Sequence, residues 1–223
     1  MPKELNLKLP SADDLFTTQD ERDDAQRERV MDLPISEISD FPDHPFKVRM
    51  DAEMQEMADS IGQHGVLVPC LVRPKDGGGY EMIAGHRRRT ASELAGRETM
   101  PCIVRDLSDD EATIIMVDSN LQREKILPSE KAFAYKMKLE AMRRQVGRPR
   151  KENVSPLGTN LRSDEQLAQQ TGDSRNQIHR FIRLTDLIPE LLQMVDNWAT
   201  REKDEYQIAM RPAVELSYRA TRS

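Results

Sequence analysis

The feature that most constrains this fold is a glycine followed by three arginines, at the point where a strand is predicted to turn into a helix. Residues 80–84 have the pattern of a short strand, and they are followed by Gly85-His86-Arg87-Arg88-Arg89. Backbone amides at the start of a helix and arginine guanidinium groups both bind phosphate. We therefore predict a phosphate-binding site formed by Gly85, His86, Arg87 and Arg88.

A second polar segment, about thirty residues further along the chain, contains side chains that can complete such a site. They are Ser119, Asn120, Gln122 and Arg123. Neutral side-chain oxygens can bind a metal ion, and a further guanidinium group can bind the phosphates of a nucleotide. Together the two segments predict a nucleotide-binding site that acts as a switch.

The composition favours a modular protein with small domains. Of the 223 residues, 32% are charged, 37% are hydrophobic and only 4% are aromatic, which is typical of a helix-rich protein without one large core. The apolar runs are far shorter than the roughly 18 residues that cross a membrane, and the polar N-terminus does not resemble a signal peptide. We therefore expect a cytoplasmic protein, in which Cys70 and Cys102 are buried thiols rather than a disulfide or a metal site.

The net charge of −6 does not argue against nucleic acid as a partner. Acidic segments can outweigh a basic face in the sum of charges, and only the local distribution of charge decides what such a face binds. The basic residues therefore have to be judged by their positions along the chain.

The first half of the chain is predicted to hold a polar arm and one mixed α/β domain. Residues 1–32 show no sustained periodicity and are expected to form a flexible arm. Within residues 33–125, one helix opens at Asp51 and ends at Gly65, and another covers residues 86–94. Strands are expected at residues 66–73, 80–84 and 100–105.

The second half is predicted to be helical, beginning with a capping box at Ser108. A helix to about residue 121 is followed by another over residues 129–144. Residues 146–161 contain glycines, prolines and asparagines, and they indicate a linker between two domains. The basic start of this linker is either a solvated hinge, which we favour, or an arm that lies against DNA phosphates.

Residues 163–184 have the pattern of a helix-turn-helix. Capping boxes are expected at Ser163 and Ser174, with Gly172 in the turn between the two helices. The second helix carries three arginines and one histidine without an acidic residue, which is more typical of a helix that reads the major groove than of a polar surface that serves solubility. The candidate DNA-binding residues are Ser174, Arg175, Asn176, Gln177, His179, Arg180 and Arg183.

Taken in order, these motifs resemble the ParB family of chromosome and plasmid partition proteins, in particular the subset on mobile elements that has histidine after the glycine. The resemblance covers residues 33–218, including residues 64–69, the Gly-His-Arg-Arg motif, residues 120–124 and the helix-turn-helix. It implies an α+β fold. A small mixed α/β N-terminal domain would occupy residues 33–125, and an all-α DNA-binding domain would occupy residues 126–223.

The resemblance also implies a function. Proteins of this family bind CTP and Mg²⁺ through the N-terminal domain, and they bind a palindromic, centromere-like site in double-stranded DNA as a homodimer. CTP closes two N-terminal domains into a clamp that slides along the DNA. The protein would then be associated with a nucleoid or a plasmid, and a ParA-type ATPase would bind its N-terminal arm.

Position by position, the resemblance assigns the nucleotide phosphates to Gly85, Arg87 and Arg88, and Mg²⁺ to Asn120. Gln122 and Arg123 would contribute to the same pocket and to its closure. The pocket for the base would be shaped by four consecutive residues, Val66, Leu67, Val68 and Pro69.

Two residues depart from the family pattern, because His86 and Ser119 stand where the family has glutamate. A carboxylate is better suited than an imidazole or a hydroxyl to hold Mg²⁺ or to polarise water. Asp118 lies one position from Ser119, which on a helix turns its side chain by about 100°. We therefore predict CTP binding with weak or absent CTP hydrolysis, and we assign no catalytic residue. Because the family's C-terminal dimerisation module is not expected in this chain, association should be weaker and nucleotide-dependent.

Two other classes of function are compatible with these residues. One is a redox or kinase enzyme on a similar domain: sulfiredoxins have a related phosphate motif, but their catalytic cysteine corresponds to Gly85, and neither Cys70 nor Cys102 is placed to replace it. The main alternative is a nucleotide-independent helix-turn-helix transcription regulator of a plasmid or mobile element, whose N-terminal domain only dimerises. Tests of nucleotide binding distinguish these classes.

Overall fold

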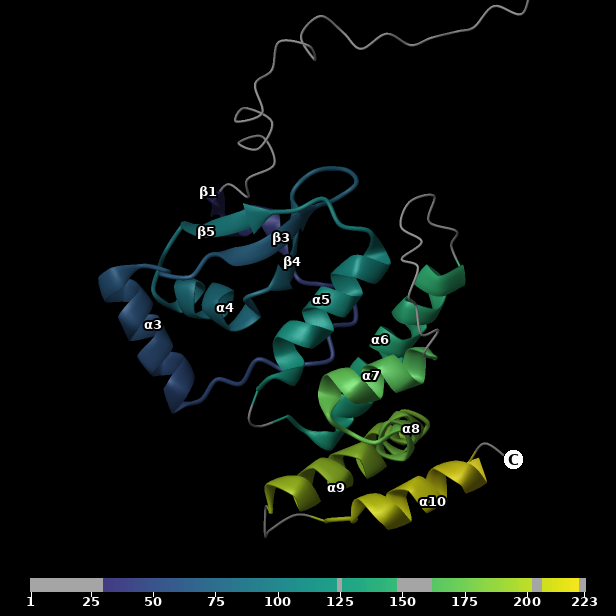
Figure 1. The fold of residues 1–223 in the computed structure, drawn as a ribbon. Helices are drawn as coiled ribbons and strands as arrows, with labels where there is room; N and C mark the ends of the chain where they lie inside the picture. Colours follow the sequence, from purple (N-terminus) through teal and green to yellow (C-terminus); the bar gives the residue numbers. More distant parts are fainter. Residues whose placement is uncertain (1–29, 124–125, 148–161, 202–205, 221–223) are drawn as a thin grey trace, which may run out of the picture.

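A computed structural model describes residues 30–123, 126–147, 162–201 and 206–220. It shows a mixed β-sheet with helices against it, followed by a bundle of helices (Figure 1). Most of the predicted arm and most of the predicted linker, residues 1–29 and 148–161, lie outside the described residues.

The sheet has five strands in the order β1-β5-β3-β4-β2. Strand β3 runs parallel to β5 and β2 runs parallel to β4, whereas the β1–β5 and β3–β4 pairs are antiparallel. A short 3-10 helix, Ile35–Glu37, joins β1 to β2. The strands are β1 (Val30–Pro34), β2 (Ile38–Ser39), β3 (Cys70–Pro74), β4 (Tyr80–Ala84) and β5 (Thr99–Val104).

Helices α3 (Ala52–His64) and α4 (His86–Leu94) pack against each other through Met54, Ala58, Ile61 and Ala91. As predicted, α3 begins where the Asp51 carboxylate accepts a hydrogen bond from the Met54 amide (3.0 Å), and it ends at Gly65, whose φ is 73°. The predicted start and end of α4 are also confirmed.

Helix α5 (Asp109–Leu121) packs against β4, with Ala112, Met116 and Val117 in contact with the cluster around Ile83. Its first turn is closed by the predicted capping box, in which Ser108 accepts from the Glu111 amide and the Glu111 carboxylate accepts from the Ser108 amide (3.1 Å). The apolar contacts with Ile83 hold α5 against β4, the strand that leads into the predicted phosphate motif.

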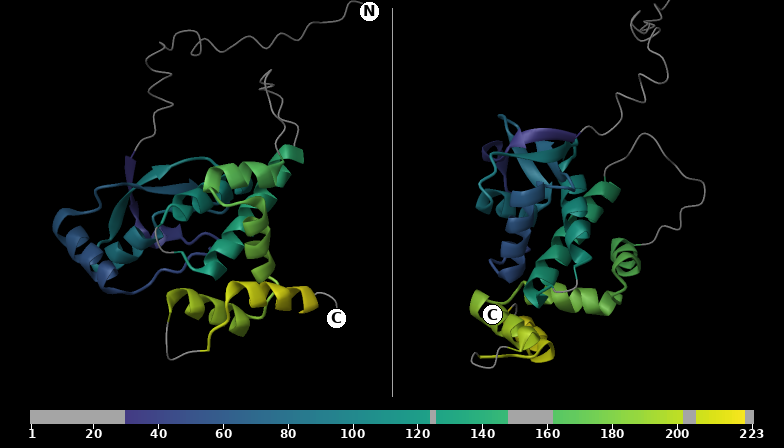
Figure 2. Two further views of the ribbon diagram at one scale, coloured as in Figure 1. Left: turned by 60° about the horizontal axis from the view of Figure 1, so that its bottom comes forward. Right: turned by 90° about the vertical axis from the view of Figure 1, so that its left-hand side faces the viewer.

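Helix α6 (Pro128–Gly147) is central to the second half of the chain, because it contacts α5, α7, α8 and α9. Helices α9 and α10 lie side by side at the end of the bundle (Figure 2). Among the described residues, no helix combines the length and the apolar character needed to span a membrane. The remaining helices are α7 (Ser163–Thr171), α8 (Arg175–Leu184), α9 (Pro189–Thr200) and α10 (Met210–Ala220).

Three of the differences from the sequence expectation have a clear physical cause. Strand β1 begins at Val30, inside the predicted arm, because it pairs with β5 and a partner so distant in sequence leaves no local pattern. The strand expected from residue 66 begins only at Cys70, since Pro69 has no amide to donate to a neighbouring strand. The capping box expected at Ser163 is wrong by one residue: Arg162 is the N-cap, and Glu165 accepts from its amide (3.2 Å).

The two cysteines are free and buried, as predicted. They are neighbours on β3 and β5, where Cys70 lies opposite Cys102 in the parallel register. Burial, together with the adjacent thiol, raises the pKa of Cys102 to about 12. Both residues therefore act as small apolar side chains of the sheet core at neutral pH.

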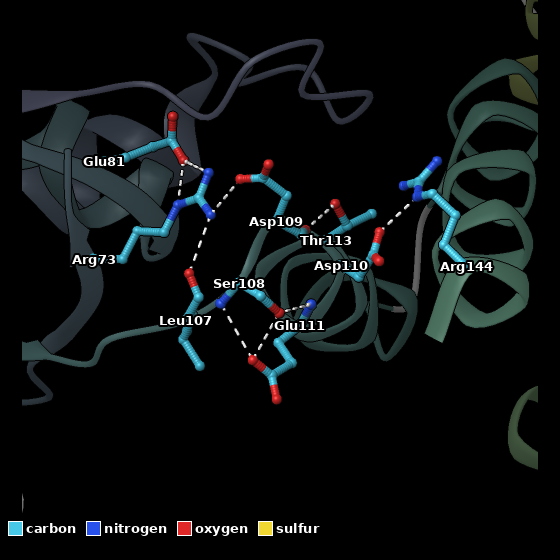
Figure 3. A network of polar contacts seen from close by, with 9 residues as sticks. All are labelled: Arg73, Glu81, Leu107, Ser108, Asp109, Asp110, Glu111, Thr113 and Arg144. Atoms are coloured by element: carbon cyan, nitrogen blue, oxygen red, sulfur yellow. Dashed lines mark hydrogen bonds and ion pairs between the residues drawn. The ribbon is translucent and has the colours of Figure 1, made fainter. Parts of the chain in front are cut away.

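An arginine network fixes α5 to the sheet (Figure 3). Arg73 on β3 binds the Glu81 carboxylate on β4 through Nε (2.6 Å) and Nη2 (2.5 Å), and the Glu81 side chain is only 6% exposed. The same guanidinium group donates to the Leu107 carbonyl (3.2 Å) and to Asp109 (2.7 Å) in the first turn of α5. One side chain thus connects two strands to the start of the helix that ends at the candidate site.

Replacing Arg73 by methionine is expected to destabilise the protein by about 3–5 kcal/mol, because it leaves the buried Glu81 carboxylate without its counter-ion. The matched control is Arg144→Met. Arg144 pairs with Asp110 (2.7 Å), but its side chain is 58% exposed, so the loss should be below about 1 kcal/mol. Urea unfolding of both variants measures the difference, and equal losses would show that the Arg73 network is not a main support of the fold.

Candidate functional site

The candidate site begins at Gly85, which lies between β4 and α4. Its φ of 116° and ψ of 16° place it in the left-handed region, and a Cβ at this position would lie 2.3 Å from Cys70 Sγ. Only glycine allows this conformation and this close contact with β3. Because glycine has no side chain, no N-cap side chain binds the amides of the first turn of α4.

The three arginines of the motif are bound by acceptors of the protein itself. Arg87 lies near Glu53 (3.4 Å) and Asp51 (3.8 Å) at the start of α3, and Arg89 pairs with Asp40 (2.6 Å). Arg88 donates to the carbonyls of Val68 and Pro69, the latter at 2.9 Å. The sequence predicted the position of these groups, but their partners come from segments far apart along the chain.

Arg88 thereby anchors the loop of residues 66–69, which the resemblance assigns to the base pocket. Leu67 and Val68 in this loop are 80% and 63% exposed, although both are large and apolar. The guanidinium group holds the backbone of the loop while its apolar side chains face solvent. The loop is therefore positioned next to the start of α4 and presents an apolar surface there.

His86 is buried and stacks on His44, with ring centroids 3.8 Å apart. His44 Nδ1 is bonded to the Phe46 carbonyl (2.8 Å), whereas His44 Nε2 and both ring nitrogens of His86 are buried without a hydrogen-bond partner. Burial, reinforced by His44 and by the positive charge of Arg123, lowers the pKa of His86 to about 3. His86 is thus a neutral imidazole at physiological pH.

The second predicted segment lies at the end of α5. Asn120 is 2% exposed; its amide nitrogen donates to the Met116 carbonyl (2.8 Å), and its Oδ1 is buried without a partner. Ser119 also donates to the Met116 carbonyl (2.9 Å). Arg123 lies over the Phe46 ring at 5.9 Å, and burial together with the charge of Arg87 lowers the pKa of Arg123.

Buried polar atoms without partners gather in this region. Since nearly all buried polar groups in folded proteins are hydrogen-bonded, such a cluster indicates groups kept for a ligand rather than for the fold. The positive charge of Arg123 acts on both histidines and is close to Arg87. The Arg123 amide donates to the Asn120 carbonyl at the end of α5, so Asn120 lies in the same region. The atoms are His44 Nε2, His86 Nδ1, His86 Nε2, Arg87 Nε and Asn120 Oδ1.

The structure adds His44 to this cluster, whereas Gln122 contributes no buried atom without a partner. Gln122 and Arg123 line a cleft of about 610 Å³ between α5, α6 and α7, together with Lys131 and Gln170. His44 was not a candidate from the sequence, because its stacking partner His86 is more than forty residues away. Its position directly before Pro45, in the irregular segment between β2 and α3, carries no pattern of its own.

Helices α7 and α8 are joined at Gly172, whose φ is 74°, and they pack through Leu167 and Ile178. Ser174 and Gln177 form the capping box of α8, as predicted, so both bind the backbone of their own helix. The exposed face of α8 carries Asn176, His179 and Arg180. Within the described part of the chain, Arg180 has no ion pair.

The two other arginines of α8 are partly neutralised. Arg175 binds Asp164 (2.7 Å) and Glu165 (3.0 Å) on α7, and His179 lies 3.4 Å from Asp164. Arg183 is 3.2 Å from Asp186, and its guanidinium lies over the ring of Tyr218 at 4.7 Å. The absence of acidic residues on α8 itself therefore overstated its free positive charge, because neighbouring elements supply the carboxylates.

The fold and the site together define an α/β domain with a candidate phosphate site, joined to a helical domain. Residues 19–121 match the model of the ParB N-terminal domain family. The chain is 35% identical to the chromosome-partitioning protein Spo0J of Thermus thermophilus over 167 residues, which are 75% of this chain and 55% of that protein. Residues 19–121 therefore belong to the ParB N-terminal domain family.

Further relatives support the same assignment. The chain is 35% identical to the stage 0 sporulation protein J of Bacillus subtilis over 172 residues, which are 77% of this chain and 54% of that protein. It is similar to the crystal structure of C-terminally truncated chromosome-partitioning protein ParB from Caulobacter crescentus complexed to the centromeric parS site, with 26% identity, a TM-score of 0.50 and 84% of each chain covered. The predicted α+β fold is confirmed, and the chain spans about half the length of the two curated relatives.

Replacing Gly85 by alanine is expected to destabilise the protein by about 3 kcal/mol or more, because it adds a collision with Cys70 Sγ to the strain of a positive φ. Gly96→Ala is the matched control. Gly96 also has a positive φ, 69°, but an added Cβ would meet nothing within 4 Å, so only about 1–2 kcal/mol should be lost. Thermal unfolding compares the two, and equal losses would show that the contact with Cys70 is easily relieved.

Proposed function

We propose that this protein is a DNA-partition protein of the ParB type, which binds CTP with Mg²⁺ at the Gly85 site and a palindromic DNA site through α7 and α8. The observation that carries the proposal is the cluster of buried, unpartnered polar atoms beside the start of α4 and the end of α5. Those two helix ends carry the two motifs that the sequence assigned to nucleotide binding, so independent properties point to the same place.

The nucleotide would be bound by groups of three kinds. The first-turn amides of α4 and the guanidinium of Arg87 would bind the phosphates, and Arg87 Nε is buried without a partner. The apolar side chains of Leu67 and Val68 offer a surface for the base. Arg88 would reach the nucleotide by exchanging one of its two backbone carbonyls for a phosphate oxygen, which links occupation of the site to the position of the loop.

The residues present fit Mg²⁺ that arrives with the nucleotide. Asn120 Oδ1 is a buried oxygen without a hydrogen-bond partner, and oxygen is the donor that Mg²⁺ prefers. Among the described residues, no group of three or more carboxylates, histidines or cysteines could hold a metal ion by itself. Asn120 would therefore supply one ligand, and the phosphates and water would supply the others.

Binding without rapid hydrolysis follows from the chemistry of His86 and Ser119. A neutral imidazole with a pKa of about 3 cannot polarise water as a carboxylate does, and the Ser119 hydroxyl is bonded to the Met116 carbonyl. The switch would then be reset by release of CTP. In this proposal two copies of the chain close over DNA as a clamp while CTP is bound, and a ParA-type ATPase would contact the arm outside the described residues.

On the DNA side, the proposal assigns base reading to the exposed part of α8. Asn176 and Arg180 are free to reach base edges, whereas Arg175 is held against α7 by two carboxylates. Arg175 and Arg183 would therefore contact phosphates or position the helix. Ser174 and Gln177 contribute through the helix start that they cap, whose amides also favour a DNA phosphate.

Wild-type protein is expected to bind CTP, but not ATP or GTP, in the presence of Mg²⁺, and Arg88→Ala is expected to abolish this binding. The control is Arg97→Ala, because Arg97 also donates to two backbone carbonyls, those of Ile61 (3.1 Å) and Gly62 (3.0 Å), away from the site. Calorimetric titration with and without a DNA palindrome tests the proposal. DNA binding that is indifferent to every nucleotide would instead identify a transcription regulator, and consumption of ATP would identify a kinase.

Arg180→Ala is expected to weaken binding to the cognate palindrome by about 1–3 kcal/mol, since an arginine that contacts a base edge contributes about that much. Arg211→Ala on α10 is the control, because it removes the same charge from an exposed side chain on another helix. Fluorescence anisotropy with cognate and scrambled DNA measures both variants. Unchanged affinity of the Arg180 variant for the cognate site would show that this arginine does not read DNA.

A further inference from the structure

We propose that His44 is a phosphate-binding residue of the nucleotide site, and that it takes up a proton when the nucleotide binds. This inference rests on the proposed function and adds a residue that lies outside both sequence motifs. It starts from the stacked pair of His44 and His86, in which three of the four ring nitrogens are buried without a hydrogen-bond partner.

The hydrogen bonding of His44 fixes which nitrogen carries the proton. Nδ1 lies 2.8 Å from the Phe46 carbonyl, and a carbonyl oxygen can only accept, so Nδ1 is the donor. In the neutral ring, Nε2 then has a lone pair and no hydrogen. A phosphate oxygen is also an acceptor, so His44 Nε2 can bind it only after the ring gains a proton.

The charges around the pair explain why it is neutral before a ligand binds. Burial is the main cause that lowers the pKa of both rings, and the positive charge of Arg123 acts on both in the same direction. Arg89 on α4 also lowers the pKa of His86. Asp40 and Glu130 raise the pKa of His44, but they do not offset the lowering by burial. A polyphosphate bound at the start of α4 would reverse this balance.

The stack gives the protonated state a favourable neighbour. An imidazolium ring of His44 at 3.8 Å from the neutral ring of His86 is stabilised as a cation over an aromatic face. His86, at the first position of α4, can donate to the phosphates from either nitrogen without a change of charge. The two histidines would thus bind the anion together, one as a cation and one as a neutral donor.

The sign of the pH dependence follows from these states. The pKa of His44 is lowered in the free protein and is raised when a polyanion binds, so binding takes up a proton between these two values. CTP affinity should therefore increase as the pH falls through the range between these two values, and it should stop increasing once the free protein is also protonated.

The test compares wild-type protein with His44→Phe and His44→Gln. Phenylalanine keeps the stack on His86 and removes the nitrogens, so CTP should bind about tenfold more weakly or worse near pH 6. The unfolding temperature should change little, because loss of the bond to the Phe46 carbonyl is offset by removal of the buried, unpartnered Nε2. Glutamine keeps a donor but cannot titrate, so it should retain part of the affinity and lose the pH dependence. His64→Phe, at an exposed position in the last turn of α3, is the control and should match wild type.

Proton uptake is measured by calorimetry in buffers of different ionisation enthalpy. Because the terminal phosphate of CTP titrates in the same range, the decisive quantity is the difference in uptake between wild type and His44→Phe. A clear difference supports the inference. Equal affinity and equal proton uptake of the two proteins would overturn it while leaving CTP binding intact, whereas failure of wild-type protein to bind CTP at all would overturn the proposed function as well.

Discussion

The contact between Gly85 and Cys70 is the constraint on which the arrangement of the site depends. Because Gly85 has no Cβ, the start of α4 lies directly against the thiol of β3, and the left-handed backbone there turns the chain from β4 into the helix. This close approach lets the Arg88 side chain reach back to the carbonyls of Val68 and Pro69 just before β3. A larger residue at position 85 would push the helix start away from the loop, and the groups of the candidate phosphate site would separate.

The elements that the sequence predicted well are those whose boundaries are set by neighbouring residues. Asp51 and Gly65 bound α3, and Gly85 divides β4 from α4, because capping and positive φ act over a few positions. The features that could not be predicted depend on distant partners. Strand β1 exists because it pairs with β5, and His44 belongs to the site because it stacks on His86. The acceptors of Arg87 and Arg175 likewise come from other helices, so the free charge of a motif cannot be judged from the motif alone.

The buried groups of the site reduce the stability of the fold, and this cost is informative. A buried polar atom without a hydrogen bond costs about 1–3 kcal/mol, so several such atoms in one small domain would be selected against unless a ligand satisfied them. The contacts around the site are correspondingly strong. Arg73 on β3 binds Glu81 on β4 and Asp109 at the start of α5, so it fixes this helix to the sheet. Buried polar atoms lack hydrogen-bond partners at the site, whereas the polar groups of the Arg73 network are paired. This contrast is expected of a functional region.

Helix α6 connects the end of α5, which forms part of the candidate site, with helices α7 and α8. Lys138 on α6 is 1% exposed and binds both Asp118, two residues before Asn120, and Gln170 on α7 (2.6 Å). One turn earlier, Tyr135 donates to Asp173 in the turn between α7 and α8 (2.5 Å), and Lys131 binds the same carboxylate (2.6 Å). A buried ammonium group cannot lose either partner without a large cost, so a shift at the end of α5 has to be followed by Lys138 and by α7. The candidate site and α8 are thereby connected through packed, charged contacts of α6.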